Sequence, residues 1–370
     1  MKFTCEKNAL VSAVSVASRT VAQKSTIPAL EGIYIRAGVK LTLSGYNLET
    51  GITISVDAEI QQTGACIMPS RLFFDIIRKL PDDTVSISVD EKFKVSIRGG
   101  ISSFTITAMS SEDYPELPEV ESDKGISLPQ NELKAMIGGT SFAVSENQAR
   151  PIHTGCLFEV EDTSITVVAV DGYRLALRRW KSEEPIGRTL KFVVPAAALK
   201  EAEKILGDTD EACTFFLGSK HILFTIGEAT LVCRLLEGEF LDWRRGLPQN
   251  QPVKLAVNVA KMTDSIERVG LIISEKLKSP VRCKFGENTA DFRSVSTIGE
   301  AHDVCQIAGD GQDMEIGFNC RYLLDALRAI PDAECSLELI NGLSPIVMNP
   351  CDGSERYSYM VLPVRLKAGE

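Results

Sequence analysis

Cysteines and histidines are the residues of this 370-residue chain best suited to metal binding or nucleophilic chemistry. No two of its ten cysteines have Cys-x-x-Cys spacing, and His153, His221 and His302 are scattered. A zinc site usually takes ligands from closely spaced pairs, so this spacing predicts no metal site. Most cysteines, such as Cys156 and Cys233, lie in apolar runs. We therefore expect buried, reduced thiols rather than disulfides.

Paired carboxylates and glycine-rich loops are the other residues with possible chemistry. The acidic pairs Asp82-Asp83 and Glu183-Glu184 lie in predicted turns, where solvated loop ends are the common role. Asp171-Gly172 follows a predicted strand, a position open to a catalytic acid, but a turn is the commoner role of this dipeptide. The sequence contains no P-loop, dinucleotide fingerprint, G-x-S-x-G turn or Cys/His nucleophile signature. It therefore predicts neither a catalytic residue nor a cofactor.

The elements that would carry these residues repeat three times, with a period of roughly 125 residues. An apolar helical face formed by Leu72, Phe73, Ile76, Ile77 and Leu80 recurs 250 residues later, and with one exception 125 residues later. Each copy opens with a further helix. The spacing predicts helices over 6–21, 70–80, 130–145, 196–206, 258–275 and 319–330.

Stretches of alternating apolar and polar residues separate the helices and predict strands. They cover 85–89, 93–97, 104–108, 222–226, 231–235, 336–340, 346–348 and 357–362. We therefore predict an α+β fold of three tandem domains, each with two helices packed on antiparallel sheets. The predicted domains are residues 1–120, 127–246 and 247–366.

The predicted helices are weakly basic, although the protein is acidic. The net charge is −10, from 40 Lys and Arg against 50 Asp and Glu, which argues against a generally adhesive nucleic-acid binder. The six helices together carry an excess of about three positive charges, and the rest of the chain is strongly acidic. Ordinary solvated helix faces would give this pattern. The alternative is one surface that meets phosphates loosely within a body that repels them.

The sequence shows neither a membrane span nor a secretory segment. It has no run of about 18 apolar residues, the length that a membrane span requires. The start, Met1-Lys-Phe-Thr-Cys-Glu, lacks the apolar core of a signal peptide and carries an early acidic residue. We therefore expect a cytoplasmic protein.

Five short segments, spread over the three copies, resemble those of one known family. They are Arg71-Leu-Phe-Phe-Asp-Ile, Val170-Asp-Gly-Tyr-Arg-Leu-Ala, Asp242-Trp-Arg-Arg-Gly-Leu-Pro, Glu315-Ile-Gly-Phe-Asn and Tyr359-Met-Val-Leu-Pro-Val-Arg-Leu. In this order, and over essentially the whole chain, they resemble the bacterial sliding clamps, the β subunits of DNA polymerase III. The resemblance implies clamp-type domains that form half of a closed ring, with helices lining the hole and sheets outside.

The same resemblance implies a non-enzymatic processivity factor and its partners. They are a second copy of the chain joined head to tail, double-stranded DNA without sequence preference, the clamp loader, the replicative DNA polymerase and other proteins with a clamp-binding motif. Topology would supply retention on DNA, so no base-reading residues are needed. No membrane partner is implied.

A pocket for partner peptides between the second and third copies is also implied by the resemblance. It would comprise Leu157, Val170, Gly172, Tyr173, Arg174, Leu175, Leu241, Arg245, Leu247, Leu343, Pro345, Met360, Leu362, Pro363, Val364 and Arg365. Aliphatic walls with arginines suit a short peptide with apolar anchors and an acidic or backbone polar group. Val170, Tyr173 and Leu241 depart from the family pattern, which implies a shifted peptide preference. For Leu157 and Leu362 the alternative role is interdomain core.

Two further surfaces follow from the resemblance. The DNA-facing residues would be Lys24, Arg71 and Asn147, supported by Arg78 and Arg150. Ala196 and Ala197 stand where some members carry basic residues, and Pro151-Ile152 replaces aromatic residues, which puts DNA contact by the second copy in doubt. The dimer interface would join Leu72, Ile76, Phe104 and Ile106 of one chain to Ile272 and Ile273 of the other.

Two other functions remain open at this point. One is a scaffold of the same shape that no longer loads on DNA, such as a diverged paralogue. The other is an enzyme that uses Asp171 or Arg174, although the sequence supplies no convergent set of polar groups for it. The tail 367–370 extends beyond the usual Arg-Leu end and has no predicted role.

Overall fold

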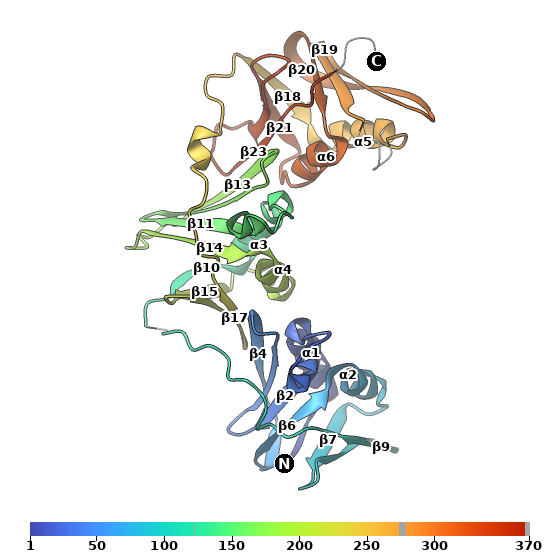
Figure 1. Cartoon of the computed structure of the whole chain (residues 1–370), viewed down its shortest axis with the longest axis vertical. Helices are drawn as coiled ribbons and strands as arrows, with labels where there is room; N and C mark the ends of the chain where they lie inside the picture. The colour runs from blue at the N-terminus through green and yellow to red at the C-terminus, as the bar shows by residue number, and fades with distance from the viewer. Residues whose placement is uncertain (122, 274–278, 367–370) are drawn as a thin grey trace. The chain divides into compact units, whose positions relative to one another are not determined.

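The computed structural model describes residues 1–121, 123–273 and 279–366. The chain folds into two compact units (Figure 1). Unit 1 comprises Met1–Lys134 and Ala197–Leu235, and unit 2 comprises Ala135–Ala196 and Leu236–Glu370. Among the described helices, none is long and apolar enough to cross a membrane.

Unit 1 contains two antiparallel sheets. In spatial order, the five-stranded sheet consists of β5 (Glu59–Gln62), β1 (Lys2–Glu6), β7 (Thr84–Val89), β8 (Lys94–Gly99) and β9 (Ser102–Thr107). The eight-stranded sheet consists of β10 (Ile126–Pro129), β15 (Ala212–Leu217), β16 (His221–Ile226), β17 (Ala229–Arg234), β4 (Thr50–Val56), β3 (Leu41–Tyr46), β2 (Gly32–Ala37) and β6 (Gly64–Pro69).

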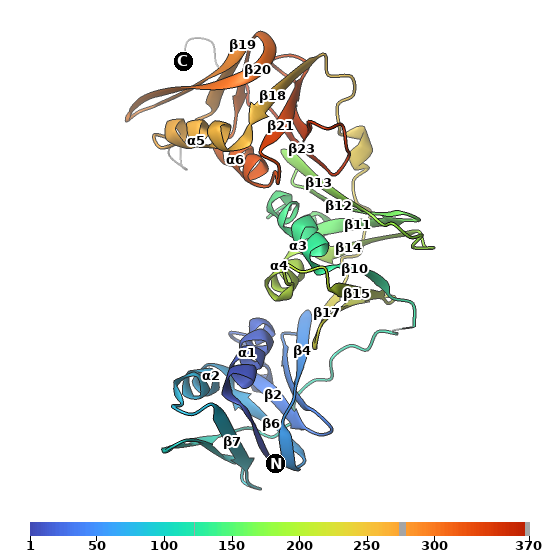
Figure 2. The same cartoon turned by 180° about the vertical axis from the view of Figure 1, so that it is seen from behind.

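Two helices of unit 1 lie side by side in both views (Figure 1; Figure 2). They are α1 (Lys7–Ala17), extended by the 3₁₀ turn η1 (Ser18–Thr20), and α2 (Ser70–Lys79). The Ser18 and Ser70 hydroxyls hydrogen-bond each other at 3.0 Å. Leu10 and Val14 of α1 and Phe73 of α2 are fully buried in one core with both sheets. Burying such a side chain contributes about 1.5–3 kcal/mol. A short 3₁₀ helix, η2 (Pro28–Glu31), precedes β2.

Unit 2 is built on one antiparallel sheet of ten strands. In spatial order they are β14 (Leu190–Pro195), β11 (Gly155–Glu161), β12 (Ser164–Val170), β13 (Arg174–Lys181), β23 (Tyr357–Val361), β22 (Ile346–Pro350), β21 (Glu334–Leu339), β18 (Val253–Asn258), β20 (Gly299–Phe318) and β19 (Val281–Ser296). Here α5 (Val259–Gly270) packs on α6 (Cys320–Arg328), β19 and β20 (Figure 2). The side chains of Asn258 and Asn319 cap these two helices by accepting hydrogen bonds from backbone N–H groups.

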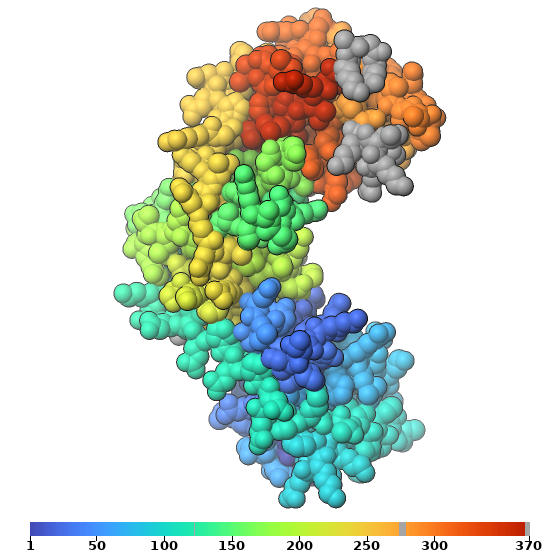
Figure 3. Space-filling view, viewed as in Figure 1, coloured from blue at the N-terminus to red at the C-terminus, as the bar shows by residue number. Residues whose placement is uncertain are grey.

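The remaining elements are short or contain a boundary between the units. The chain passes between the units within α3 (Gln130–Gly138) and within α4 (Ala196–Ile205). The 3₁₀ helices η3 (Ser141–Ala143), η4 (Pro151–Thr154) and η5 (Trp243–Arg245) belong to unit 2. We call residues 236–252, between β17 and β18, the connector. It runs over the surface of unit 2 and is yellow in Figure 3.

Strand pairs join consecutive copies of the repeat. β4 of the first copy pairs with β17 of the second, from Ile54 opposite Ala229 to Thr50 opposite Cys233. β13 of the second copy pairs with β23 of the third. Each junction thus uses the last strand of one copy and a strand from the middle of the copy before it. Neighbouring copies are therefore bound by backbone hydrogen bonds.

The predicted α+β fold is confirmed, and so are all six helices and the eight strand stretches, with shifts at their ends. The helix predicted over 130–145 is wrong in length, since α3 ends at Gly138. At Gly139 a Cβ atom would lie 2.9 Å from Arg178 side-chain carbons, and Thr140 turns its hydroxyl back to the Met136 carbonyl. The helix predicted over 258–275 ends at Gly270, and Glu275 lies outside the described residues. The first helix is also shorter, because the chain after Ala17 continues as a 3₁₀ turn.

All ten cysteines are free thiols, eight of them buried, as their apolar surroundings predicted. Cys320 is half-buried and Cys351 is exposed. Burial raises the pKa of the Cys66, Cys213 and Cys233 thiols to about 12. These buried thiols are therefore protonated and poor nucleophiles at neutral pH.

Candidate functional site

Four segments of unit 2 carry the residues assigned by resemblance to the peptide pocket: the β12–β13 turn, β23 with the residues after it, the connector, and the β21–β22 loop. β13 and β23 pair with Leu175 opposite Met360 and Arg174 opposite Val361. Beyond this ladder, the Leu362 N–H donates to the Tyr173 carbonyl at 2.8 Å. Strand pairing therefore brings together residues that lie almost 190 positions apart in the sequence.

The predicted pocket residues divide into a buried floor and an exposed rim. Leu157, Val170, Leu175 and Met360 are at most 8 % exposed and belong to one apolar cluster, with Leu247 and Leu362 packed against it. The exposed rim residues are Gly172, Tyr173, Leu241, Arg245, Leu343, Val364 and Arg365. Pro345 and Pro363 are half-buried. This arrangement can hold apolar anchors against the floor while polar groups meet the rim.

Arg174 is fully engaged inside unit 2. Its guanidinium donates to the Asp171 carboxylate at 3.0 Å, to the Asp325 carboxylate at 2.6 Å and to the Phe142 carbonyl at 2.6 Å. It also lies over the Tyr322 ring, 4.3 Å from its centroid. In this arrangement Arg174 ties the β12–β13 turn to α6, whereas Arg245 and Arg365 are exposed to solvent.

Asp171 and Gly172 form the turn that precedes Arg174. One Asp171 carboxylate oxygen accepts the Tyr173 N–H at 2.9 Å and the Arg174 N–H at 3.0 Å. Gly172 has φ of 90°, a left-handed conformation that disfavours residues with a side chain. The turn role predicted for this dipeptide is confirmed. The turn also holds Tyr173 outward, where its ring stacks on Tyr322 with centroids 6.0 Å apart.

A buried carboxylate anchors the connector to the sheet. Glu159, 8 % exposed, accepts the Trp243 indole N–H at 3.2 Å and forms ion pairs with Arg244 at 2.8 Å and Lys191 at 3.3 Å. Arg244 also lies over the Trp243 ring, 4.2 Å from its centroid. Trp243 itself is buried in the apolar cluster. This contact fixes the connector beside the predicted pocket floor.

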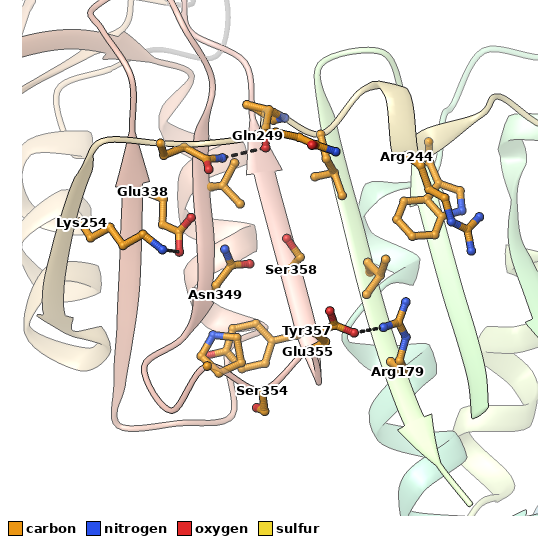
Figure 4. Close-up of a pocket in the computed structure, with 18 residues that line it drawn as sticks. Arg179, Arg244, Gln249, Lys254, Glu338, Asn349, Ser354, Glu355, Tyr357 and Ser358 are labelled. Atoms are coloured by element: carbon orange, nitrogen blue, oxygen red, sulfur yellow. Dashed lines mark hydrogen bonds and ion pairs between the residues drawn. The ribbon is translucent and has the colours of Figure 1, made fainter. Parts of the chain in front are cut away.

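A hollow of about 540 Å³ lies between the connector and one face of the ten-stranded sheet (Figure 4). Leu177, Trp243, Leu247 and Val347 line it and also belong to or pack on the apolar cluster. Its other lining residues are mainly polar: Arg179, Arg244, Gln249, Gln251, Lys254, Glu338, Asn349, Ser354, Glu355 and Ser358. Leu247 is the lining residue shared with the predicted peptide pocket.

Several residues of this region escaped the sequence reasoning. Trp243 was visible within the segment Asp242-Trp-Arg-Arg-Gly-Leu-Pro, and Val347 lay in the strand predicted over 346–348. Tyr322 and Asp325 carried no signal beyond their places in the sixth helix. Their contacts with Arg174 depend on packing between the second and third copies.

The residues assigned to DNA contact are exposed. In unit 1, Arg71 lies on the first turn of α2 and Lys24 follows η1, and neither has an ion-pair partner among the described residues. Arg78 is partly neutralised by Asp75 at 3.4 Å. In unit 2, Asn147 and Arg150 precede η4, and the Asn147 carboxamide accepts the Ala149 N–H.

The residues assigned to the dimer interface lie on the edge strand β9, on α2 and just after α5. β9, which carries Phe104 and Ile106, is the last strand in the order of the described five-stranded sheet. Phe104 is 41 % exposed, whereas Ile106 packs on the core of unit 1. On α2, Leu72 is 49 % exposed and Ile76 is buried. In unit 2, Ile272 and Ile273 are half-buried just after α5.

Metal ligands do not cluster in the part of the chain that the structure covers. No group of three or more His, Cys, Asp or Glu side chains is placed there to hold an ion. His302 is bonded to Asp291 at 2.6 Å on the exposed β19–β20 hairpin, far in sequence from the other two histidines.

Known proteins match this chain over nearly its whole length. The family models for the N-terminal, central and C-terminal domains of the DNA polymerase III beta subunit match residues 1–118, 127–242 and 244–365. The beta sliding clamp of Staphylococcus epidermidis is 32% identical over 99% of both chains. The structure of the DNA polymerase sliding clamp from Bacillus subtilis matches with a TM-score of 0.94 and 30% identity, covering 99% of this chain and 100% of that one.

A second solved structure gives the same result. A putative DNA polymerase III beta subunit from Eubacterium rectale matches with a TM-score of 0.93 and 32% identity, over 99% of this chain and 100% of that one. The chain therefore belongs to the DNA polymerase III β-subunit family, the bacterial sliding clamps, whose members are accessory processivity factors and not catalytic subunits.

Proposed function

We propose that two copies of this sliding clamp close head to tail into a ring around duplex DNA, and that partner proteins bind unit 2 through short peptides. The clamp loader, the replicative polymerase and other peptide-carrying proteins are the proposed partners. Membership of the family supports the ring and its DNA and polymerase partners. The apolar floor and exposed rim of unit 2 carry the proposal for the peptides.

The equivalence of three strands supports a joint between chains. β9, β17 and β23 each end one copy of the repeat. β17 and β23 pair with strands of the preceding copy, β4 and β13. β9 has no preceding copy in its own chain and ends its sheet among the described strands. A second chain that supplies this neighbour would close the ring by two-fold symmetry.

Exposed apolar side chains on β9 and α2 also favour a covered surface. An edge strand with unpaired backbone groups and apolar side chains invites uncontrolled association. Phe104 on β9 and Leu72 on α2 are both more than 40 % exposed. If Ile272 and Ile273 of a second copy covered these side chains, uncontrolled association would be prevented.

Weak attraction to DNA suits this proposal. Lys24 and Arg71 are exposed without ion-pair partners in the described part of the chain, whereas Arg78, Lys134 and Arg328 are paired with carboxylates. A few unpaired cations on an acidic protein would give a loose, salt-sensitive track. Retention would then depend on the closed ring and not on affinity.

The peptide proposal predicts modest, exchangeable affinity. Each apolar anchor that reaches the floor contributes about 1.5–3 kcal/mol, and the cost of association offsets part of this gain, so a few anchors give weak and reversible binding. Binding of this strength allows polymerase, loader and other partners to exchange at one site.

A point variant in the pocket wall tests the peptide site. Leu247→Asp places a charge against the apolar cluster, and we expect it to weaken a labelled peptide with Gln, Leu and Phe at least tenfold in fluorescence anisotropy. Val39→Asp, at a fully exposed residue of unit 1, is the matched control. Native affinity in the folded Leu247→Asp variant would contradict the assignment. A deletion from residue 360 is less suitable, because Met360 and Val361 pair with β13 and β22.

A further inference from the structure

The hollow under the connector continues from the apolar cluster of the predicted peptide pocket. Leu177, Trp243 and Val347 line the hollow and also belong to the buried cluster that contains Leu175 and Met360. The hollow and the predicted pocket share Leu247. Its volume of about 540 Å³ is enough for several amino-acid side chains.

Two polar side chains on its sheet wall have no hydrogen-bond partner in the described residues. Met348 and Tyr359 are partners in the β22–β23 register, so Asn349 and Ser358 are the next residues on these adjacent strands. Both are half-buried and line the hollow (Figure 4). An amide and a hydroxyl can each donate and accept, so together they can bind a polar group that enters the hollow.

The charged groups of the hollow, by contrast, are already paired. Lys254 and Glu338 form an ion pair at 3.1 Å, and Arg179 is bonded to Glu355 (Figure 4). Arg244 is held by Glu159 at 2.8 Å. A charged ligand would have to compete with these pairs, whereas a neutral polar ligand would not.

We propose that the hollow binds residues flanking the apolar anchors of a partner peptide, and that it favours neutral polar side chains: Asn, Gln, Ser and Thr. This inference rests on the proposed peptide site and assigns it a second compartment. Anchor residues fill the apolar floor, and flanking residues pass under the connector to Asn349 and Ser358. The compartment therefore makes partners with the same anchors differ in their affinity for the clamp.

The test compares peptides by fluorescence anisotropy on the full-length protein. A core peptide carries only Gln and the Leu and Phe anchors. Extended peptides add an Asn/Ser/Gln segment at the N-terminal or the C-terminal end, and matched peptides carry acidic or basic extensions. We expect one of the two neutral extensions to tighten binding about tenfold, which corresponds to about 1.4 kcal/mol. Its acidic and basic counterparts should gain less.

Alanine variants test whether Asn349 and Ser358 cause the gain in affinity. In Asn349→Ala with Ser358→Ala, we expect the neutral extension to improve binding less than twofold, while the core peptide keeps its native affinity. The matched control is Asn8→Ala with Ser12→Ala, which removes the same residue types from the exposed face of α1 and should keep the tenfold gain.

The possible failures are distinct. No gain from either neutral extension, or a full gain in the Asn349/Ser358 variant, overturns the second compartment and leaves the peptide site standing. An equal gain from charged extensions overturns the preference for neutral residues. Failure of the core peptide to bind the native protein would instead overturn the proposed peptide site, and the second compartment with it.

Discussion

Arg174 is the residue on which the frame of the predicted pocket most depends. Its buried guanidinium joins the Asp171 turn, the Asp325 carboxylate of α6 and the Phe142 carbonyl. Asp325 lies 151 residues away in the sequence. A resemblance to the family placed Arg174 in the pocket, but only the fold reveals that its donors are used within unit 2.

Replacing Arg174 should destabilise unit 2 rather than only alter peptide binding. Arg174→Met leaves the Asp171 and Asp325 carboxylates without their shared donor, and we expect a loss of about 3 kcal/mol in the free energy of unfolding. The value is at the low end for a buried pair because Asp325 is partly exposed. Arg321→Met removes an exposed arginine 3.9 Å from the same carboxylate and should cost less than about 1 kcal/mol. Equal urea midpoints for the two variants would refute this role.

His153 should make the stability of the protein depend on pH. Burial, with a smaller effect of Arg150, lowers the pKa of His153 in the folded state. Its Nδ1 is buried without a partner in the described structure. The unfolded chain therefore takes up a proton first as pH falls below the usual histidine value of about 6.5, and folded stability decreases.

The measurement compares urea unfolding at pH 7.5 and pH 5.5 for the native chain and for His153→Gln. We expect the native chain to lose more stability across this interval than the variant. The difference at pH 7.5, where His153 is neutral in both states, isolates the effect of lost packing against the Phe240 ring. The same pH dependence in both proteins would show that His153 has no such effect.

At the level of elements, the spacing of apolar residues predicted the helices and strands whose formation depends on residues close together in the sequence. The apolar spacing of Phe73, Ile76 and Ile77 predicted a helix, and the alternation of Val85 and Ile87 predicted a strand, because these residues bury one face of each element. The helix predicted over 130–145 ends at Gly138, just before Gly139, where Arg178 from β13 approaches the backbone. A local sequence pattern cannot show that a side chain from a distant strand lies close to the helix end.

Replacing the isoleucines after α5 tests the proposed dimer interface. Ile272→Ala with Ile273→Ala removes apolar surface that a second copy is proposed to bury against Phe104 and Leu72. Loss of a buried large side chain costs about 2–5 kcal/mol, so we expect a shift from dimer to monomer at low micromolar concentration in sedimentation velocity. Val39→Ala, at an exposed loop residue, should remain dimeric. A dimer of native strength in the double variant would exclude these isoleucines from the interface.

At the scale of the whole molecule, the repeat period predicted the number of copies, but not how they join. The joints are the β4–β17 and β13–β23 strand pairs, and pairing partners that far apart leave no spacing signal in the sequence. The same limit applies to the hollow under the connector. Its residues come from β13, β18, β21, β22 and β23 as well as from the connector, and no single motif contains them.

The charges in the sequence do allow a prediction about DNA binding. A net charge of −10 with few unpaired helix cations implies weak binding to open DNA. A clamp of this composition must be retained by topology. A scaffold that no longer loads would show weak binding without such retention.

Retention on closed circular DNA is the most direct test of the ring. The protein is loaded onto a nicked circular plasmid by its clamp loader with ATP, free protein is removed by gel filtration, and the circle is then cut at one site. We predict that the clamp stays on the circle for many minutes at a salt concentration that abolishes its binding to short open duplexes, and that it leaves promptly after the cut. Equal retention on circular and linear DNA, or none on the circle, would contradict the account.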